Sequence, residues 1–275
     1  MMKTPTESKT NRSRSVSVRR FPAGDIDLDA IVVEEPLEMR VEGRALAVTM
    51  RTPGHDRELV AGFLYTEGCV DGADDIRAIE HVRDPLDPQD NTVDVRLAAG
   101  VSMDEGRFAS AQRAFYASSS CGICGKATID SVLSGAPPLQ SPIRVGAEYL
   151  LSLPDRMRAL QSTFDRTGGL HAAALFTPGG DVEVLREDVG RHNAVDKVLG
   201  WRLLADRVPV EDAVMLISGR AGFEIVQKAL VARVPVVAAV GAPTTLAVSL
   251  ANEAGIQLVG FLRDGRFNQY APGTE

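Results

Sequence analysis

Apolar and polar residues follow different patterns in the two halves of this chain. In the first half, residues 45–51 and 92–97 alternate between apolar and polar side chains, as strands with one buried face do. Residues 56–67 and 108–117 instead repeat apolar side chains at helical spacing. Proline and glycine concentrate at residues 135–142, which indicates a boundary between the halves. The first half therefore predicts a small α+β region.

The second half alternates helices with strands that are apolar throughout. Strands are expected at residues 172–176, 182–185, 213–217, 234–240 and 257–262. Helices are expected near residues 152–164, 191–204, 223–232 and 245–253, the first with Ser152 as its cap and Pro154 in its first turn. Continuous apolar strands indicate a sheet that is covered on both faces. The order predicts an α/β fold, a three-layer α/β/α sandwich whose mixed sheet starts with a hairpin and continues with parallel strands.

These patterns divide the chain into three parts. Residues 1–20 are rich in lysine and arginine and contain Glu7 as their one acidic residue. They have no apolar segment of the kind that a secretory signal needs, so we expect a disordered basic tail. Residues 21–145 form the N-terminal α+β region, which ends in a cysteine-containing loop, and residues 146–275 form the sandwich.

Composition and charge narrow the function classes. The 275 residues are 44% hydrophobic and 24% charged, as expected of a globular protein with a substantial core. The formal net charge of −7 argues against a general attraction to nucleic acids or acidic membranes. No apolar run reaches the length of a membrane span. A cytoplasmic location is therefore expected, where cysteines stay reduced.

The strongest chemical signal is the segment SSSCGICGK at residues 118–126, which holds two of the three cysteines. Its small residues leave the sulfur atoms uncovered, and a helical pattern that includes Ile129 follows. Cys124 would then lie near a helix N-terminus, with Lys126 adding positive charge, and both features favour a thiolate. The loop therefore indicates sulfur nucleophilicity at Cys121 and Cys124.

Other roles fit this cysteine pair less well. A buried structural pair would have large apolar neighbours, and a structural disulfide is uncommon in a reducing compartment. A zinc site needs about four ligands, and Cys69 and the histidines supply no second paired spacing, so no metal is expected. A thioredoxin-like pair normally follows the first strand of a βαβ unit, whereas this pair comes more than a hundred residues into the chain. A dithiol oxidoreductase nevertheless stays an alternative.

Polar and glycine residues also gather where predicted strands meet helices. These turns lie at residues 167–171, 186–197, 218–220 and 241–245. A glycine turn that opens onto a helix N-terminus is a ready anion site, and Arg191 and Arg220 supply guanidinium groups that fit phosphate oxygens. His171 and His192 lie in the same turns, where they serve either as structural or as binding groups. The G-x-G-x-x-G and P-loop patterns are absent, so a nucleotide would bind through another arrangement.

With these motifs, the chain resembles the FdhD family of formate dehydrogenase accessory sulfurtransferases. The resemblance rests on the cysteine loop and on the run REDVGRHNAVDK at residues 186–197, both of which are specific. Further matching segments are RTPGHD at 51–56, GFL at 62–64, TGGLH at 167–171, SGR at 218–220, GAPT at 241–244 and GF at 260–261 with Arg263. Together they span about residues 30–270, nearly the whole chain.

The resemblance implies a function. A cysteine desulfurase would load sulfur onto Cys121 as a persulfide. The chain would then transfer this sulfur to the molybdenum bis(molybdopterin guanine dinucleotide) cofactor before the cofactor enters formate dehydrogenase. Cys124 would assist, Lys126 would favour the Cys121 anion, and the protein would be a homodimer. A non-catalytic carrier that only shields and delivers the cofactor is a further alternative.

The cofactor would be a ligand of this protein, with a free guanine nucleotide as its analogue. The family's cofactor-binding stretch matches Phe261, Leu262, Arg263, Asp264, Gly265 and Arg266. The turns add Gly168, Gly169, His171, Arg191, His192, Ser218, Gly219, Arg220 and Gly241 as candidate contacts. The resemblance also implies a cytidine-deaminase-like fold for residues 146–275, without the zinc signature H-x-E…P-C-x-x-C. No structural metal, nucleic acid or membrane contact is expected.

Overall fold

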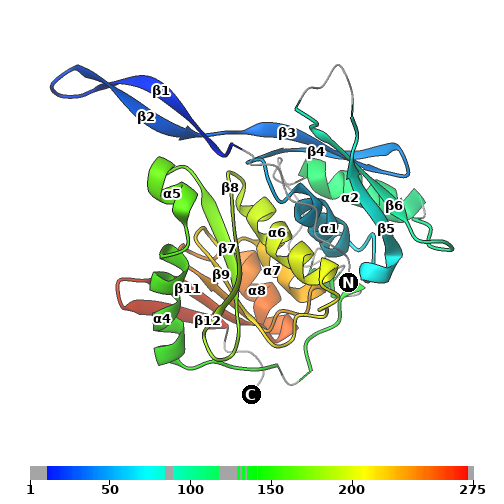
Figure 1. The fold of residues 1–275 in the computed structure, drawn as a ribbon. Helices are drawn as coiled ribbons and strands as arrows, with labels where there is room; N and C mark the ends of the chain where they lie inside the picture. Colours follow the sequence, from blue (N-terminus) through cyan, green and yellow to red (C-terminus); the bar gives the residue numbers. More distant parts are fainter. Residues whose placement is uncertain are drawn as a thin grey trace.

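In the computed structural model, the second half of the chain builds one mixed sheet (Figure 1). The structure describes residues 11–83, 89–103, 105–117, 129–130, 132–133, 135–140 and 142–271. Within these residues the sheet has six strands in the order β12-β11-β10-β9-β7-β8. The strands are β7 His171–Phe176, β8 Val182–Asp188, β9 Val214–Ile217, β10 Val236–Ala239, β11 Gln257–Arg263 and β12 Arg266–Ala271. Strands β9, β10 and β11 are parallel, whereas β7, β8 and β12 add antiparallel edges, which confirms the mixed α/β character.

Helices cover both faces of this sheet. They are α4 Ala147–Arg158, α5 Ser162–Thr167, α6 Arg191–Leu204, α7 Phe223–Val231 and α8 Thr245–Ala254. Side chains of α4 pack on one face, and those of α6, α7 and α8 pack on the other. Successive strand residues point to opposite faces, so Ala172 lies in the α4 cluster and Ala173 in the other. Burial on both faces explains why the inner strands β7, β9, β10 and β11 are mostly apolar.

Helix α4 differs from its prediction. It begins at Ala147, so Ser152 and Pro154 lie inside the helix rather than at its start. It ends before Phe164, which belongs to the separate helix α5. The reason is burial, because one face of α4 packs against the sheet on both sides of the proline, through Leu150, Leu153 and Met157.

The first half of the described chain forms a second sheet, in the order β4-β3-β6-β5. Its elements are β3 Glu35–Val41, β4 Arg44–Arg51, α1 Asp56–Thr66, a 3-10 turn at Ala73–Asp75, β5 Ile76–His81, β6 Thr92–Leu97 and α2 Glu105–Ala117. Strands β3 and β6 are parallel, and the other neighbours are antiparallel. The strands predicted at 45–51 and 92–97 and the helix predicted at 56–67 are confirmed within a few residues. Across the described residues, every helix is too short or too polar to cross a lipid bilayer.

A two-stranded hairpin precedes this sheet. Strand β1 (Ser13–Arg20) pairs antiparallel with β2 (Asp25–Val32), and Figure 1 shows the hairpin projecting from the body of the molecule. The prediction of a disordered tail over residues 1–20 is therefore wrong for Ser13–Arg20. One of the basic residues that suggested a solvated tail, Arg20, meets Asp27 and Asp29 across the hairpin instead. Arg20 Nε, for example, lies 2.8 Å from Asp27 Oδ2.

Two glycines allow the two halves to pack closely. A Cβ atom added at Gly62 of α1 would overlap the carbonyl oxygen of Asp196 in α6. A Cβ atom added at Gly200 of α6 would overlap the carbonyl oxygen of Glu58 in α1. The two helix backbones are therefore in direct contact, and any larger side chain at either position would force them apart.

Candidate functional site

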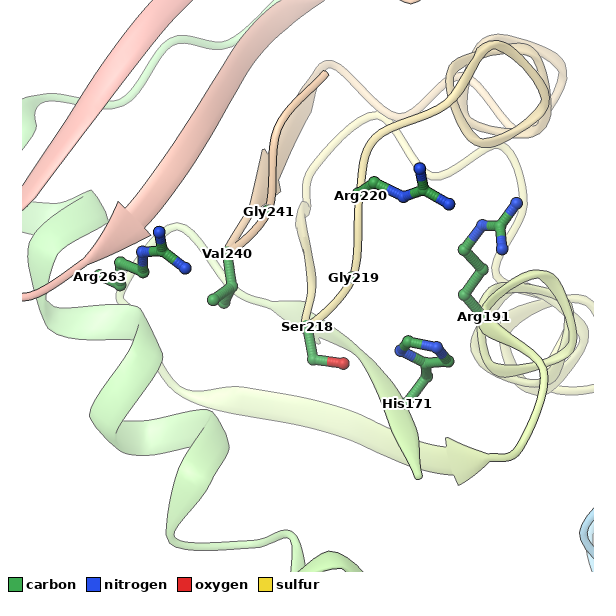
Figure 2. A pocket seen from close by; sticks show the side chains of 8 residues that line it. All are labelled: His171, Arg191, Ser218, Gly219, Arg220, Val240, Gly241 and Arg263. Carbon is green, nitrogen blue, oxygen red and sulfur yellow. The ribbon is translucent and has the colours of Figure 1, made fainter. Parts of the chain in front are cut away.

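A small cavity opens where β9 and β10 end and β7 begins (Figure 2). Its volume is about 220 Å³, and it is lined by His171, Arg191, Ser218, Gly219, Arg220, Val240, Gly241 and Arg263. All of these except Val240 are among the predicted ligand contacts. Residues from separate turns meet here because the carboxyl ends of neighbouring parallel strands lie at the same edge of a sheet.

The backbone of this cavity extends the sheet beyond its strands. The Gly241 N–H donates to the Gly219 carbonyl at 3.0 Å, and the Phe261 N–H donates to the Gly241 carbonyl at 3.0 Å. A Cβ atom at Gly241 would lie 2.7 Å from the Gly219 carbonyl oxygen, so a larger residue does not fit. These hydrogen-bonded turns give the cavity a fixed wall.

The cavity is positively charged. Arg191 is the first residue of α6, where the helix N-terminus adds a partial positive charge. Figure 2 shows Arg191 and Arg220 on one side of the cavity and Arg263 on the other. Among the described residues, Arg191 and Arg220 form no ion pair with a carboxylate. The arrangement therefore suits an anion with several oxygens, such as a phosphate group.

His171 adds a neutral hydrogen-bonding group to this cavity. Its side chain is half-buried, and burial lowers its pKa. The positive charges of Arg191, His192 and Arg220 lower the pKa further. The lowered pKa favours the uncharged imidazole near neutral pH, so the arginines are the main source of positive charge in the cavity.

A larger compartment of about 620 Å³ adjoins the small cavity. The two share His171, Ser218, Val240 and Arg263 as lining residues. The predicted residues Gly168, Gly169, Leu262 and Asp264 also line the larger compartment. Residues that the sequence did not indicate as ligand contacts come from α4, α5 and the residues between them, and they include Pro154, Met157, Gln161 and Phe164. No motif in the sequence marks them as ligand contacts.

A bulge in β11 directs Arg263 towards the cavities. Phe261 has a φ of 54°, which is unusual for a bulky residue, and the β11–β12 register shifts between Gly260 and Arg263. Within the predicted stretch, Leu262, Arg263 and Asp264 line a cavity, whereas Phe261, Gly265 and Arg266 line neither. Because of the bulge and the β-turn that follows it, the side chains of residues 261–266 point in different directions.

Most of the REDVGRHNAVDK run is a buried scaffold. Asp188 and Lys197 are fully buried, with 2.7 Å between Oδ2 and Nζ. Asp188 Oδ1 also accepts from the Gly190 N–H at 2.8 Å and from Asn193 Nδ2 at 2.9 Å. Burial lowers the pKa of Lys197, and the Asp188 charge opposes that shift. Arg191 is thus the part of this run that lines a cavity.

The same run fixes β8 and α6 to the first half of the chain. Lys197 Nζ donates to the Thr52 carbonyl at 3.0 Å. Arg186 Nη2 donates to Glu58 Oε1 of α1 at 2.7 Å. Burial alone would raise the pKa of Glu58, but hydrogen bonds from Arg186 and His55 outweigh it and hold this pKa below its usual range. The matching RTPGHD segment therefore has a structural role in joining the two sheets.

His192 does not line either cavity. Its Nε2 lies 3.0 Å from Glu224 Oε2, in the first turn of α7. Hydrogen bonding to His192 is the main cause that lowers the pKa of Glu224. Of the two roles left open for this histidine, the structural one agrees with this position.

The predicted nucleophiles Cys121 and Cys124 and the neighbouring Lys126 lie outside the described residues. Cys69, in contrast, is buried, with a relative exposure of 3%. Burial raises the pKa of its thiol to about 12, so it is protonated near neutral pH. In the part of the chain that the structure describes, no three His, Cys, Asp or Glu side chains gather as a metal site.

Comparisons with known proteins agree with the resemblance predicted from the motifs. The sulfur carrier protein FdhD of Streptomyces avermitilis is 51% identical over 249 residues, covering 88% of this chain and 87% of the relative. The sulfur carrier protein FdhD of Mycolicibacterium paratuberculosis is 50% identical over 248 residues, covering 88% and 90%. A crystal structure of a formate dehydrogenase accessory protein from Desulfotalea psychrophila shows the same fold, with a TM-score of 0.70 and 24% identity over 94% of this chain and 96% of that chain. The model of the FdhD/NarQ family matches residues 32–274, and the chain therefore belongs to this family.

Proposed function

We propose that this protein is a sulfur carrier for the maturation of formate dehydrogenase. A cysteine desulfurase loads Cys121 with a persulfide, and the sulfur passes to the molybdenum bis(molybdopterin guanine dinucleotide) cofactor before that cofactor enters the enzyme. The names of the relatives support the sulfur-carrier role. The observation that best supports an anionic cargo is the arginine-lined cavity at the sheet edge.

The loading step is an exchange at sulfur. The Cys121 thiolate attacks the outer sulfur of the persulfide on the desulfurase. A new S–S bond forms on Cys121, the S–S bond of the donor breaks, and the donor cysteine leaves as a thiolate. No external oxidant or reductant is needed. The rate depends on the thiolate fraction and access of the attacking cysteine, which the small residues of the loop and Lys126 favour.

The cargo is large and carries several phosphates. Arg191, Arg220 and Arg263 supply charge-assisted hydrogen bonds, which are roughly twice as strong as neutral ones. The net charge of −7 does not oppose this binding, because the local field of the cavity acts on the bound group. The larger compartment beside the arginines offers apolar surface for the uncharged parts of the same ligand.

Mass spectrometry tests the persulfide directly. The protein is incubated with cysteine and a cysteine desulfurase, and its intact mass is measured before and after reduction. We expect a gain of one sulfur atom that a reductant removes and that Cys121→Ala abolishes. Cys69→Ala is the matched control and should keep the gain, because the Cys69 thiol is buried. A gain that survives in Cys121→Ala would contradict the proposed sulfur position.

The two alternatives give different results in cells that depend on this protein for formate dehydrogenase activity. A dithiol oxidoreductase needs both thiols, so full activity with Cys124→Ala would exclude it. A carrier that only delivers the cofactor needs neither, so full activity with Cys121→Ala would favour it. Sulfur transfer predicts that Cys121→Ala abolishes formate dehydrogenase activity while the protein level stays unchanged.

A further inference from the structure

We propose that His192 and Glu224 are positioning residues for anion binding. Their contact sets the spacing of two arginines, Arg191 and Arg220, and so favours an anion that spans both guanidinium groups. His192 and Glu224 act through these arginines and do not touch the anion themselves. This inference rests on the proposed function, because the cargo of that function carries linked phosphate groups.

The two arginines lie at the starts of neighbouring helices. Arg191 is the first residue of α6, and Arg220 lies in the turn just before α7, which begins at Phe223. A Cβ atom added at Gly219, next to Arg220, would lie 3.7 Å from Arg191 Cβ, so the start of α6 packs against this turn. The distance between the two guanidinium groups therefore depends on how far apart the two helix starts are.

His192 and Glu224 bridge these two helix starts. Each is the second residue of its helix, and His192 Nε2 lies 3.0 Å from Glu224 Oε2. Between the first turns of α6 and α7, the described part of the chain contains no other side-chain hydrogen bond or ion pair. Neither residue lines a cavity. The contact is therefore placed to fix the helix starts and not to hold a ligand.

A second contact, one helical turn further on, holds the same two helices together. Lys228 Nζ lies 3.0 Å from Asp196 Oδ1, and both side chains are buried. Residues four apart lie on one face of a helix, so the two contacts follow each other along the boundary between α6 and α7. Lys228 Nζ also donates to Thr66 Oγ1 of α1 at 2.8 Å. The deeper contact thus fixes both helices to the first half of the chain, and the outer contact fixes their starts.

The charge of Glu224 has the wrong sign for an anion site. The hydrogen bond with His192 is the main cause that lowers the pKa of Glu224, and the charge of Arg191 lowers it as well. The carboxylate is therefore ionised near neutral pH and weakens the positive field around Arg191. If its charge alone mattered, removing it would strengthen the binding of every anion. A positioning role predicts the opposite for an anion that needs both arginines.

Calorimetric titration of the full-length protein with inorganic phosphate and inorganic pyrophosphate distinguishes the two roles. Glu224→Ala removes both the charge and the hydrogen bond, whereas Glu224→Gln removes the charge and keeps an oxygen that accepts from His192. We expect Glu224→Ala to bind pyrophosphate about tenfold more weakly, as expected when one charge-assisted hydrogen bond is lost. Phosphate affinity should change little, because one guanidinium group is enough to hold a single phosphate. Glu224→Gln should bind pyrophosphate at least as tightly as the wild type.

Further variants test the contact from the other helix. His192→Ala should lose pyrophosphate affinity as Glu224→Ala does, and the double variant should lose no more than either single variant, because both remove the same contact. The pair is partly exposed, at 26% and 39%, so these variants should keep nearly the stability of the wild type. Glu253→Ala removes an exposed carboxylate of α8 outside both cavities. It is the matched control and should bind both anions as the wild type does.

The results separate this inference from the function on which it rests. Unchanged or tighter pyrophosphate binding by Glu224→Ala would overturn the positioning role, and so would equal losses in the alanine and glutamine variants; the proposed function would stand in both cases. Equal affinity of the wild type for phosphate and pyrophosphate would overturn the preference for a spanning anion. If the wild type binds neither probe, the inference and the anion site of the proposed function both fail. Circular dichroism and the melting temperature of each variant show whether a loss of binding comes from misfolding.

Discussion

Replacing Lys197 with methionine should destabilise the protein by roughly 3 kcal/mol. Lys197 and Asp188 have no exposed side-chain surface, and the substitution leaves the Asp188 carboxylate buried without its counter-charge. Breaking a buried pair in this way costs about 3–5 kcal/mol. The carboxylate keeps its donors, which are the N–H groups of Thr52 at 3.2 Å and Gly190 at 2.8 Å and the Asn193 amide at 2.9 Å. These three hydrogen bonds place the loss at the lower end of the range.

Urea unfolding followed by fluorescence measures this loss. The chain has one tryptophan, Trp201, and it lies in α6 with Lys197. With a slope of roughly 3 kcal/mol per molar urea, the midpoint should fall by about 1 M. Arg20→Met is the control and should leave the midpoint nearly unchanged, because Arg20 and its partners Asp27 and Asp29 are about half exposed. The double variant Asp188→Asn/Lys197→Met should recover part of the loss, because it removes the unpaired charge.

Two results would refute the reasoning about this pair. One is a midpoint for Lys197→Met that equals that of Arg20→Met. The other is a double variant that is as unstable as the sum of the two single variants, since coupled residues in contact do not act independently. Either result would mean that the contact between Asp188 and Lys197 contributes little to stability.

Three further predictions follow from the same packing and electrostatics. Gly62→Ala should lower the free energy of unfolding by about 1–3 kcal/mol or more, because the added Cβ atom overlaps α6. Gly72→Ala, where a Cβ atom meets nothing, should change it little. Equal urea midpoints for the two variants would contradict the direct contact between the backbones of α1 and α6. The pKa of His171, measured by NMR, should lie below 6.5 and rise when pyrophosphate binds, and an unchanged pKa with saturating pyrophosphate would remove His171 from the anion site. Because this pKa is lowered in the folded state, the stability that comes from the neutral imidazole is complete above pH 6.5 and is lost as the pH falls through the folded pKa. The ionised Glu58 contributes stability that is complete above its ordinary pKa of 4.5 and is lost as the pH falls through the lower folded pKa. Glu58→Gln should therefore weaken the dependence of urea unfolding on acid pH. The same pH dependence in the variant and the wild type would argue against the pairing of Glu58 with Arg186.

The sequence predicts the inner strands of the six-stranded sheet well, because β7, β9, β10 and β11 are buried on both faces. Burial on both faces removes polar residues from the strands, which makes the runs at 213–217 and 257–262 easy to recognise. Exposure explains why two strands, β1 and β12, were not predicted. Strand β1 alternates serine with valine and arginine and projects into solvent, so its pattern does not differ from that of a solvated tail. Four of the six residues of β12 are polar and at least partly exposed, so its apolar residues show no strand-like alternation.

The candidate site could be predicted where turns carry glycine and arginine, because glycine allows a close approach of the backbone and arginine binds anionic oxygens. Gly219, Gly241 and Arg220 meet as the parallel strands require. Gln161 and Phe164 could not be found in this way. Their contribution depends on tertiary packing and not on any local pattern, because they reach the compartment only when α4 packs on the sheet through Leu150, Leu153 and Met157.

Helix α6 shows why one sequence run serves both the scaffold and the site. Asn193, Asp196, Lys197 and Gly200 recur at helical spacing, and each contacts the first half of the chain. Arg191 precedes this face and lies in the cavity instead. The position of its guanidinium group is therefore set by a helix that is held at several points along its length. A substitution on the buried face of α6 should thus change both stability and anion affinity, whereas a substitution at Arg191 should change anion affinity alone.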